Sequence, residues 1–333
     1  MNEIRAIVSD IKKGNIKPIY FLMGDEPYYI DKISDFIEQN ILDETEKGFN
    51  QQIMYGRDSS IEDIVSSAKR YPMMADKQVI IVKEAQDLSR NIEKLVSYAE
   101  NPQLTTVLVL NYKYKKLDKR KKLCKAIAKS GLLFESKKLY ENQVSDWIRR
   151  VLSGKKYQIE PKAAQMLVEF LGADLSKISN ELDKLLLILP KEQIITASHI
   201  EDNIGISKDF NNFELRKSLG EKNVVKANRI INYFSENPKN NPLVMTISLL
   251  NSFFTQLLMF HALQDKSKNA VAKAIGVSPY FVDEYFLAAR NYPMRKVASI
   301  IALLREADVK SKGVGANQSQ NDILKELLFS ILH

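Results

Sequence analysis

Cysteine and histidine are scarce in this chain of 333 residues. Cys124 is the only cysteine, which excludes an intramolecular disulfide and a cysteine-based zinc cluster and fits a reducing compartment. The three histidines, His199, His261 and His333, are far apart in the sequence, with no carboxylate at metal-ligand spacing. The sequence therefore predicts no metal site and no catalytic triad.

A glycine-rich phosphate loop is also missing. Such a loop needs glycines, a lysine and a hydroxyl group, whereas here an apolar run leads through Gly24 directly to Asp25 and Glu26, whose carboxylates would repel phosphate. A second apolar run ends in Lys83, where an active ATPase has the acidic residue that holds magnesium, and Glu84 reads as a surface carboxylate. We interpret these five residues as a degenerate, non-functional nucleotide site.

No signal peptide or membrane span is predicted. The amino terminus lacks an uninterrupted apolar core, so we expect a cytoplasmic protein. The longest apolar stretch, residues 243–263, carries polar residues about once per helical turn, which favours a core helix of a soluble bundle over a membrane helix. The net charge of +8 permits contact with nucleic acid or an acidic protein surface but does not require it.

Residues 18–136 alternate short, continuously apolar runs with helical patterns. Runs of this kind predict a parallel sheet covered on both faces, and therefore a doubly wound α/β domain of RecA-like layout. The expected strands are residues 19–23, 52–55, 79–82, 106–110 and 132–134. The expected helices are residues 29–42, 60–69, 88–100 and 117–129.

After residue 138 the strand pattern nearly disappears. One helix is predicted to open at Pro161 and end at Gly172, another is capped by Asp174, and a short helix follows Thr196. Residues 207–212 read as a hinge, and the remainder is helical again. The predicted domains are an α/β domain (1–139), a small helical lid domain (140–208) and an all-α collar domain (209–333).

This order of domains resembles the AAA+ clamp-loader subunits, and local motifs narrow the resemblance to the delta subunit of the bacterial DNA polymerase III clamp loader. The resemblance spans nearly the whole chain, and its specificity comes from the order and spacing of the motifs together. The segments that carry it are residues 18–27, 71–82, 116–120, 174–185 and 280–290.

The resemblance implies a subunit without intrinsic catalytic activity or cofactor. Delta subunits bind the ring-shaped sliding clamp (beta) and help to open it, so that it can be placed on primed DNA, but they do not hydrolyse ATP. The missing phosphate loop agrees, as does Asn91 after Ser89 and Arg90, where delta-prime and gamma/tau relatives have a Ser-Arg-Cys motif. The implied partners are the clamp, the delta-prime and gamma/tau subunits, and primed DNA through the assembled complex.

In the family an apolar pair inserts into a pocket of the clamp, and that pair maps to Met73 and Met74, after Pro72. Family members commonly have Leu-Phe or Phe-Phe here, although methionine suits an adaptable pocket. Taken without the resemblance, a methionine pair ahead of a strand is typical of core packing. Pro72 on one side and Asp76 with Lys77 on the other favour an exposed turn.

The segment from Lys113 to Lys129 holds nine cationic side chains in seventeen residues, against one acid, Asp118. One hypothesis is phosphate contact with DNA, helped by Tyr112 and Tyr114; the other is a solvated helix face with Leu117, Leu123 and Ile127 turned to the core. The basic segment makes a stand-alone DNA-binding module one alternative to the clamp-loader role. A divergent AAA+ ATPase is the other. The candidate DNA contacts are Lys116, Lys119, Arg120, Lys121 and Lys122.

Overall fold

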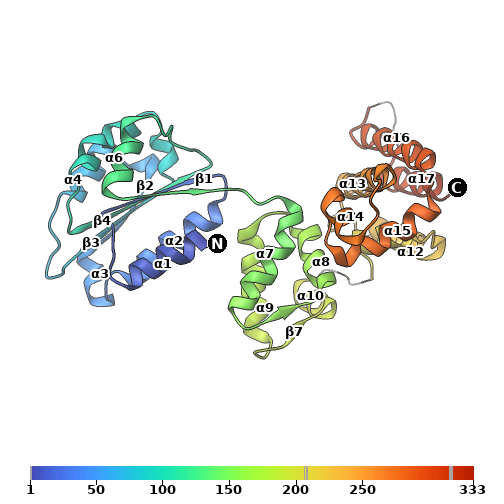
Figure 1. Ribbon diagram of the computed structural model, residues 1–333, viewed down its shortest axis with the longest axis horizontal. Helices are drawn as coiled ribbons and strands as arrows, with labels where there is room; N and C mark the ends of the chain where they lie inside the picture. Colours follow the sequence, from blue (N-terminus) through green and yellow to red (C-terminus); the bar gives the residue numbers. More distant parts are fainter. Residues whose placement is uncertain (1, 206, 208, 315–317) are drawn as a thin grey trace. The chain divides into compact units, whose positions relative to one another are not determined.

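The structure is a computed structural model that describes residues 2–205, 207, 209–314 and 318–333 (Figure 1). The chain forms two compact units, Met1–Leu139 and Tyr140–His333. Lys208, inside the expected hinge, lies outside the described residues. The further division of the second unit into lid and collar domains at residue 208 stays a prediction.

The first unit is built on a five-stranded parallel sheet with the strand order β2-β3-β4-β1-β5. Ile19 of β1 lies opposite Leu108 of β4, and Tyr20 lies opposite Leu132 of β5, so β1 is flanked on both sides. The predicted α/β fold with a parallel sheet is confirmed. The strands are β1 (Ile19–Gly24), β2 (Gln51–Tyr55), β3 (Gln78–Lys83), β4 (Thr106–Lys113) and β5 (Leu132–Ser136).

Helices cover both faces of this sheet (Figure 1). On one face, Phe21 of β1 and Leu108 of β4 share a core with α4, α5 and α6. Alternate strand residues such as Leu22 point to the opposite face, where α2 lies on the sheet and α1 packs on α2. These helices are α1 (Asn2–Lys12), α2 (Pro27–Asn40), α3 (Glu44–Asn50), α4 (Ile61–Ala68), α5 (Val96–Glu100) and α6 (Lys122–Ser130); short 3₁₀ turns are η1 (Gly56–Asp58), η2 (Ala85–Leu88) and η3 (Ile92–Leu95).

Two expected helices are shorter than predicted. Residues 88–100 form η3 and α5 after a break at Ser89 and Asn91, residue types whose side chains compete with helical hydrogen bonding. The helix expected at 117–129 begins only at Lys122, because buried Leu117 donates its backbone N–H to the sulfur of Met23 and the chain is still extended at residue 121. Helices α1 and α3 were not predicted.

The second unit is almost entirely helical. One hydrophobic core of this unit joins residues of α11, α12, α13, α14, α15, α16 and α17. The two-residue parallel strands β6 and β7 were missed by the sequence pattern because so short a pairing has no periodicity. The elements are α7 (Glu141–Gly154), β6 (Gln158–Ile159), α8 (Pro161–Leu171), α9 (Leu175–Ile188), β7 (Ile194–Ile195), α10 (Ala197–Ile204), α11 (Asn212–Gly220), α12 (Val224–Glu236), α13 (Leu243–Ala262), α14 (Lys268–Ile275), η4 (Pro279–Phe281), α15 (Val282–Asn291), α16 (Met294–Ser311) and α17 (Gln320–Leu332).

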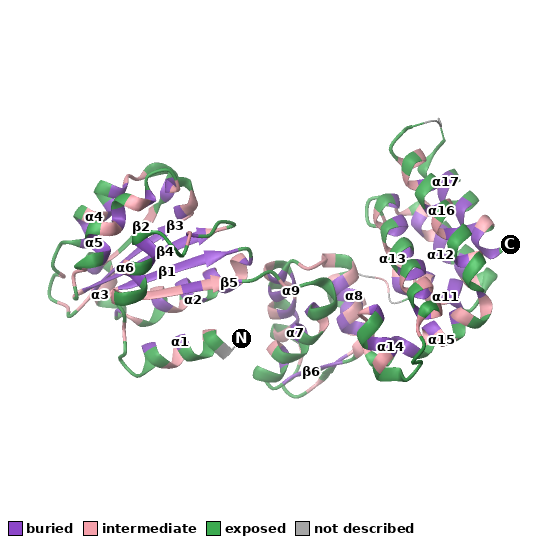
Figure 2. Ribbon diagram, turned by 45° about the horizontal axis from the view of Figure 1, so that its top comes forward, coloured by how far each residue is buried: buried purple, intermediate pink, exposed green. Residues whose placement is uncertain are grey.

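Burial follows the expected amphipathic pattern: β1 and β4 are buried along their length, and the helices expose their outer faces (Figure 2). Within the described residues one helix, α13, is long and apolar enough to cross a membrane by length and composition alone. Its Ile247, Leu250, Phe253 and Phe254 are buried in the helical core, where α13 packs against α14, α15 and α16. This placement accounts for its apolar composition as a core helix.

Candidate functional site

The turn after β1 is too short to wrap around a phosphate. Only Asp25 and Glu26 separate Gly24, the last residue of β1, from Pro27, the first of α2. The buried carboxylate of Glu26 caps α2 by accepting a hydrogen bond from the backbone N–H of Tyr28 at 3.3 Å. An α-helix amino terminus is a ready site for an anion, and here the chain's own carboxylate occupies it.

The backbone beyond β4 fills the remaining space beside this turn. Gly24 donates its N–H to the carbonyl of Lys115 at 3.1 Å and accepts from the N–H of Tyr114 at 2.8 Å. On its other side Gly24 meets β5 so closely that a Cβ there would lie 2.1 Å from the carbonyl oxygen of Ser136. Backbone therefore packs against both sides of Gly24 at the end of β1, where a phosphate loop would need space for its ligand.

Lys113 lies among carboxylates where β3 and β4 end. Its Nζ is 2.9 Å from Asp31 of α2 and 3.0 Å from Glu84, which follows β3. Lys83, which stands in the place of an acidic magnesium ligand, pairs with Glu38 of α2 at 3.5 Å. The carboxyl ends of parallel strands are where open α/β sheets bind ligands, and in this chain protein ion pairs occupy that edge.

The pKa shifts of Lys113 and Glu84 both favour the charged forms of these side chains. Burial disfavours the charged lysine, but its hydrogen bonds with Asp31 and Glu84 raise the pKa of Lys113 above its ordinary value. Burial likewise opposes ionisation of Glu84, and hydrogen bonds from Gln86 and Lys113 nevertheless hold its pKa below the usual range.

The loop that joins α4 to β3 exposes the methionine pair. Met73 is 63% exposed and Met74 is 104% exposed, so both side chains project into solvent, and Tyr71 beside them is 76% exposed. Met74 has a left-handed backbone with φ 54°, and the chain bends through residues 73–76. The expected exposed turn is confirmed, and core packing of the pair is excluded. Pro72, Met73 and Met74 remain candidate clamp contacts.

This loop is held at three places. Asn50, buried at the end of α3, bonds to the backbone of Met73 at both its N–H (2.7 Å) and its carbonyl (2.9 Å). Gln78 donates to the carbonyl of Arg70, and the ammonium group of Lys77 donates to the carbonyl of Leu104 at 2.7 Å. The sequence analysis missed Asn50, because its role rests on a partner 23 residues away with no local pattern.

Most of the candidate DNA contacts are paired with acidic side chains. Four of the five have a carboxylate partner, and Lys122 alone has no salt bridge within the described part of the chain. Paired cations attract phosphate less strongly than free ones. The pairs are Lys116 with Asp25 and Glu135, Lys119 with Glu135, Arg120 with Asp118, and Lys121 with Glu93.

The two tyrosines proposed to assist DNA contact differ in exposure. Tyr112 is buried and its ring packs against Phe21, so the hypothesis that it assists DNA contact is wrong; Tyr114 is 66% exposed. Leu117, Leu123 and Ile127 are buried, as the solvated-helix hypothesis requires. The segment therefore combines a core-facing apolar side with a solvent-facing basic side.

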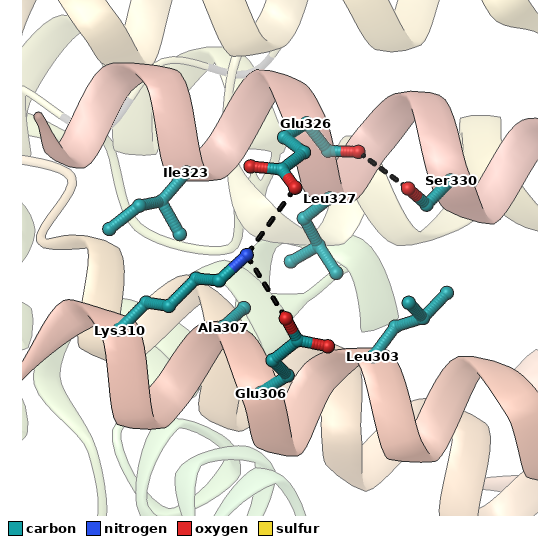
Figure 3. A pocket seen from close by; sticks show the side chains of 8 residues that line it. All are labelled: Leu303, Glu306, Ala307, Lys310, Ile323, Glu326, Leu327 and Ser330. Carbon is teal, nitrogen blue, oxygen red and sulfur yellow. Dashed lines mark hydrogen bonds and ion pairs between the residues drawn. The ribbon is translucent and has the colours of Figure 1, made fainter. Parts of the chain in front are cut away.

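One cavity, between α16 and α17, has a volume of about 30 Å³ and is lined by Leu303, Ile323 and Leu327 beside charged groups (Figure 3). Lys310 points between Glu306 at 3.1 Å and Glu326 at 3.3 Å, and these hydrogen bonds raise the pKa of Lys310. So small a space fits helix packing rather than a nucleotide. Among the residues that the structure describes, no cluster of three or more His, Cys, Asp or Glu side chains could hold a metal ion.

Comparison with known proteins places both ends of the chain in one family. Residues 20–137 match the family model described as DNA polymerase III, delta subunit, and residues 209–330 match the model of its C-terminal domain. The chain is 26% identical over 313 residues to DNA polymerase III subunit delta of Bacillus subtilis (strain 168), covering 91% of this chain and 90% of the relative. It is 19% identical to a probable subunit delta of Aquifex aeolicus (strain VF5), over 88% of this chain and 86% of that protein.

A solved structure agrees with the sequence matches. The Bacillus subtilis DNA clamp loader delta protein (YqeN) superposes with a TM-score of 0.56 at 25% identity, and 99% of each chain is covered. The two family models, the full-length relative and this structure converge on the resemblance that the sequence motifs indicated. The chain therefore belongs to the DNA polymerase III delta subunit family and is a clamp-loader subunit.

Proposed function

We propose that this clamp-loader subunit binds the ring-shaped sliding clamp through Met73 and Met74 and helps to open it for loading on primed DNA, without hydrolysing ATP. The observation that supports the proposal most directly is the loop from α4 to β3, which presents two solvent-exposed methionine side chains on a backbone held by buried Asn50. Burial of two methionines can supply roughly 3–6 kcal/mol before the costs of association.

The closed sheet edge supports the non-hydrolytic part of the proposal. The short turn after β1 and the helix capped by Glu26 form no phosphate cradle, and Asp31 and Glu84 are paired with Lys113 where an active ATPase would hold magnesium. We infer that ATP turnover belongs to other subunits of the assembly, the delta-prime and gamma/tau subunits, which the helical collar, residues 209–333, would hold. The assembly would act on primed DNA in the cytoplasm.

The test is binding of the purified chain to its cognate sliding clamp, comparing wild type with a Met73→Ser/Met74→Ser double mutant. Loss of about 2–4 kcal/mol of apolar burial should weaken binding roughly thirtyfold to a thousandfold, with an unchanged thermal melt. The matched control is Leu187→Ser/Ile188→Ser, an exposed apolar pair of α9, which should bind as wild type does.

Three results would count against the proposal. Wild-type affinity in the methionine mutant would show that other residues make the clamp contact. Turnover of ATP by the purified chain would contradict the non-hydrolytic role and favour a divergent ATPase. Tight, salt-sensitive DNA binding by the isolated chain, lost on changing Lys119, Lys121 and Lys122 to Glu, would favour the DNA-binding module instead.

A further inference from the structure

Both ends of the Asn50 side-chain amide make hydrogen bonds. Its Oδ1 accepts from the backbone N–H of Met73 at 2.7 Å, while its Nδ2 donates to the Met73 carbonyl at 2.9 Å and to the carbonyl of Glu46 at 3.3 Å. Asn50 is only 5% exposed, so water does not readily replace these bonds. The Asn50 amide both donates a hydrogen bond to Met73 and accepts one from it. Two residues of neighbouring antiparallel strands exchange backbone hydrogen bonds in the same way.

Helix α3 places this amide. Asp43 caps the helix, its backbone N–H bonded to Glu46 at 3.0 Å, and acidic residues occupy the first turn. The helix ends at Asn50, and the next residue begins β2, whose pairing with β3 fixes the position of the junction. The amide therefore lies directly beside the sheet, whereas Met73 lies in the middle of the loop between α4 and β3.

The contact is specific to asparagine. Aspartate has the same shape but no donor, so it would set a carboxylate oxygen against the Met73 carbonyl, and alanine would remove both bonds to the Met73 backbone. Directly after the held residue, Met74 has φ 54° and is fully exposed. The bonds at Met73 therefore hold the backbone where the chain bends and the exposed pair projects.

We propose that Asn50 is a positioning residue for clamp binding: by fixing the Met73 backbone, it keeps the methionine pair in the binding-competent conformation before the clamp arrives. The inference rests on the proposed function, because it assumes that Met73 and Met74 are the clamp contact. A loop that is ordered in advance loses less conformational freedom on binding, and a loop that is only partly in the competent state binds with proportionally lower affinity.

The experiment measures association and dissociation rates of the full chain with its cognate sliding clamp. The variants are Asn50→Ala, the isosteric Asn50→Asp, and the Met73→Ser/Met74→Ser mutant. We expect both Asn50 variants to bind roughly tenfold more weakly, chiefly through slower association, while the methionine mutant dissociates faster. Amide hydrogen exchange at Met73 should speed up in both Asn50 variants.

The matched control is Asn40→Ala. Asn40, at the end of α2, donates to the carbonyl of Phe36 four residues earlier at 2.8 Å, as Asn50 does to Glu46, but it is exposed and makes no recorded side-chain bond to the loop in the described structure. It should bind the clamp as wild type does. A wild-type rate of exchange at Met73 should accompany that result.

Each contrary outcome has a distinct meaning. Wild-type binding by both Asn50 variants, with binding lost in the methionine mutant, would overturn the positioning role and leave the proposed function standing. Weak binding by both Asn50 variants with a collapsed thermal melt, or an equal loss in Asn40→Ala, would mean general destabilisation and would also overturn it. Wild-type binding by the methionine mutant would overturn the proposed clamp contact and this inference together.

Discussion

Lys113 puts a protein cation among the carboxylates where strands β3 and β4 end. Its side chain is 15% exposed, and its partners Asp31 and Glu84 come from segments 82 and 29 residues earlier in the chain. In the sequence this lysine is one of nine cations in a basic segment, so composition alone suggests solvent or phosphate as its surroundings. Its contacts instead make it part of the sheet edge.

Replacing Lys113 with methionine should lower the free energy of unfolding by about 1–2 kcal/mol at pH 7, because Asp31 and Glu84 lose their shared cation. The figure is at the low end for a broken ion pair since both carboxylates, 40% and 39% exposed, remain partly screened by water. Urea unfolding measures it, and Lys125→Met, at an exposed lysine without a salt bridge in the described residues, should change stability by less than about 0.5 kcal/mol.

The pH dependence of this change follows from Glu84, whose pKa is lowered in the folded chain. Its contribution to stability is fully present above the unfolded carboxyl pKa and is lost as pH falls through the folded value. The difference between Lys113→Met and wild type should therefore shrink below about pH 4, where carboxylates protonate. A difference that stayed constant from pH 7 to pH 3 would contradict the ion-pair explanation.

At the scale of elements, the pairing of β1 with β5 depends on a glycine. Gly24 has φ 125°, a backbone conformation that L side chains rarely adopt, and it lies against the backbone of Ser136. Gly24, which looks in the sequence like the remnant of a phosphate loop, is therefore required for a structural reason. Strands β1 and β5 approach too closely at this point to admit a side chain.

Gly24→Ala should lower the free energy of unfolding by more than about 3 kcal/mol, because a Cβ 2.1 Å from the Ser136 carbonyl forces β1 and β5 apart in addition to straining the backbone. Gly14→Ala is the control: Gly14 also has a positive φ, 81°, but nothing lies within 4 Å of its Cβ position. It should cost about 1 kcal/mol. Equal losses in urea unfolding would show that backbone strain alone explains the effect.

At the scale of the whole molecule, ion pairs join the predicted lid and collar segments inside the second unit. Lys162 of α8 pairs with Glu214 of α11 at 2.5 Å, and Glu169, also of α8, lies 3.7 Å from Arg216, also of α11. Helix α8 supplies the cation of the first pair and the anion of the second. Both pairs can therefore form in only one alignment of α8 against α11. Glu214 is 5% exposed and also pairs with Lys226.

Glu214→Gln should lower the free energy of unfolding of the second unit by about 1–3 kcal/mol at pH 7. Burial opposes ionisation of Glu214, yet Lys162 and Lys226 hold its pKa below the usual value, so its stabilisation is present above the unfolded carboxyl pKa and is lost as pH falls through the lowered one. Urea unfolding at pH 7 and pH 3 checks this. Glu221→Gln, at an exposed position, should have little effect at either pH.

The alternation of strands and helices in residues 18–136, the absence of a phosphate loop, and most of the helices after residue 140 could be predicted from the sequence alone. Each of these follows from residues close together in the chain: apolar periodicity, capping residues such as Asp174, and the presence or absence of a short motif. The exposed turn at Met73 and Met74 was also predictable, from the proline and charged residues beside it.

Contacts between residues far apart in the sequence became known only from the folded structure. Asn50 bonds to Met73 because β2 and β3 are neighbours, Lys113 reaches Asp31 because α2 lies on the sheet, and Leu117 delays the start of α6 because Met23 lies beside it. No local pattern encodes such contacts, since they depend on strand order and on which helix covers which face. Local sequence patterns therefore predict most of the helices and strands and the missing phosphate loop, whereas tertiary packing determines which distant side chains contact one another.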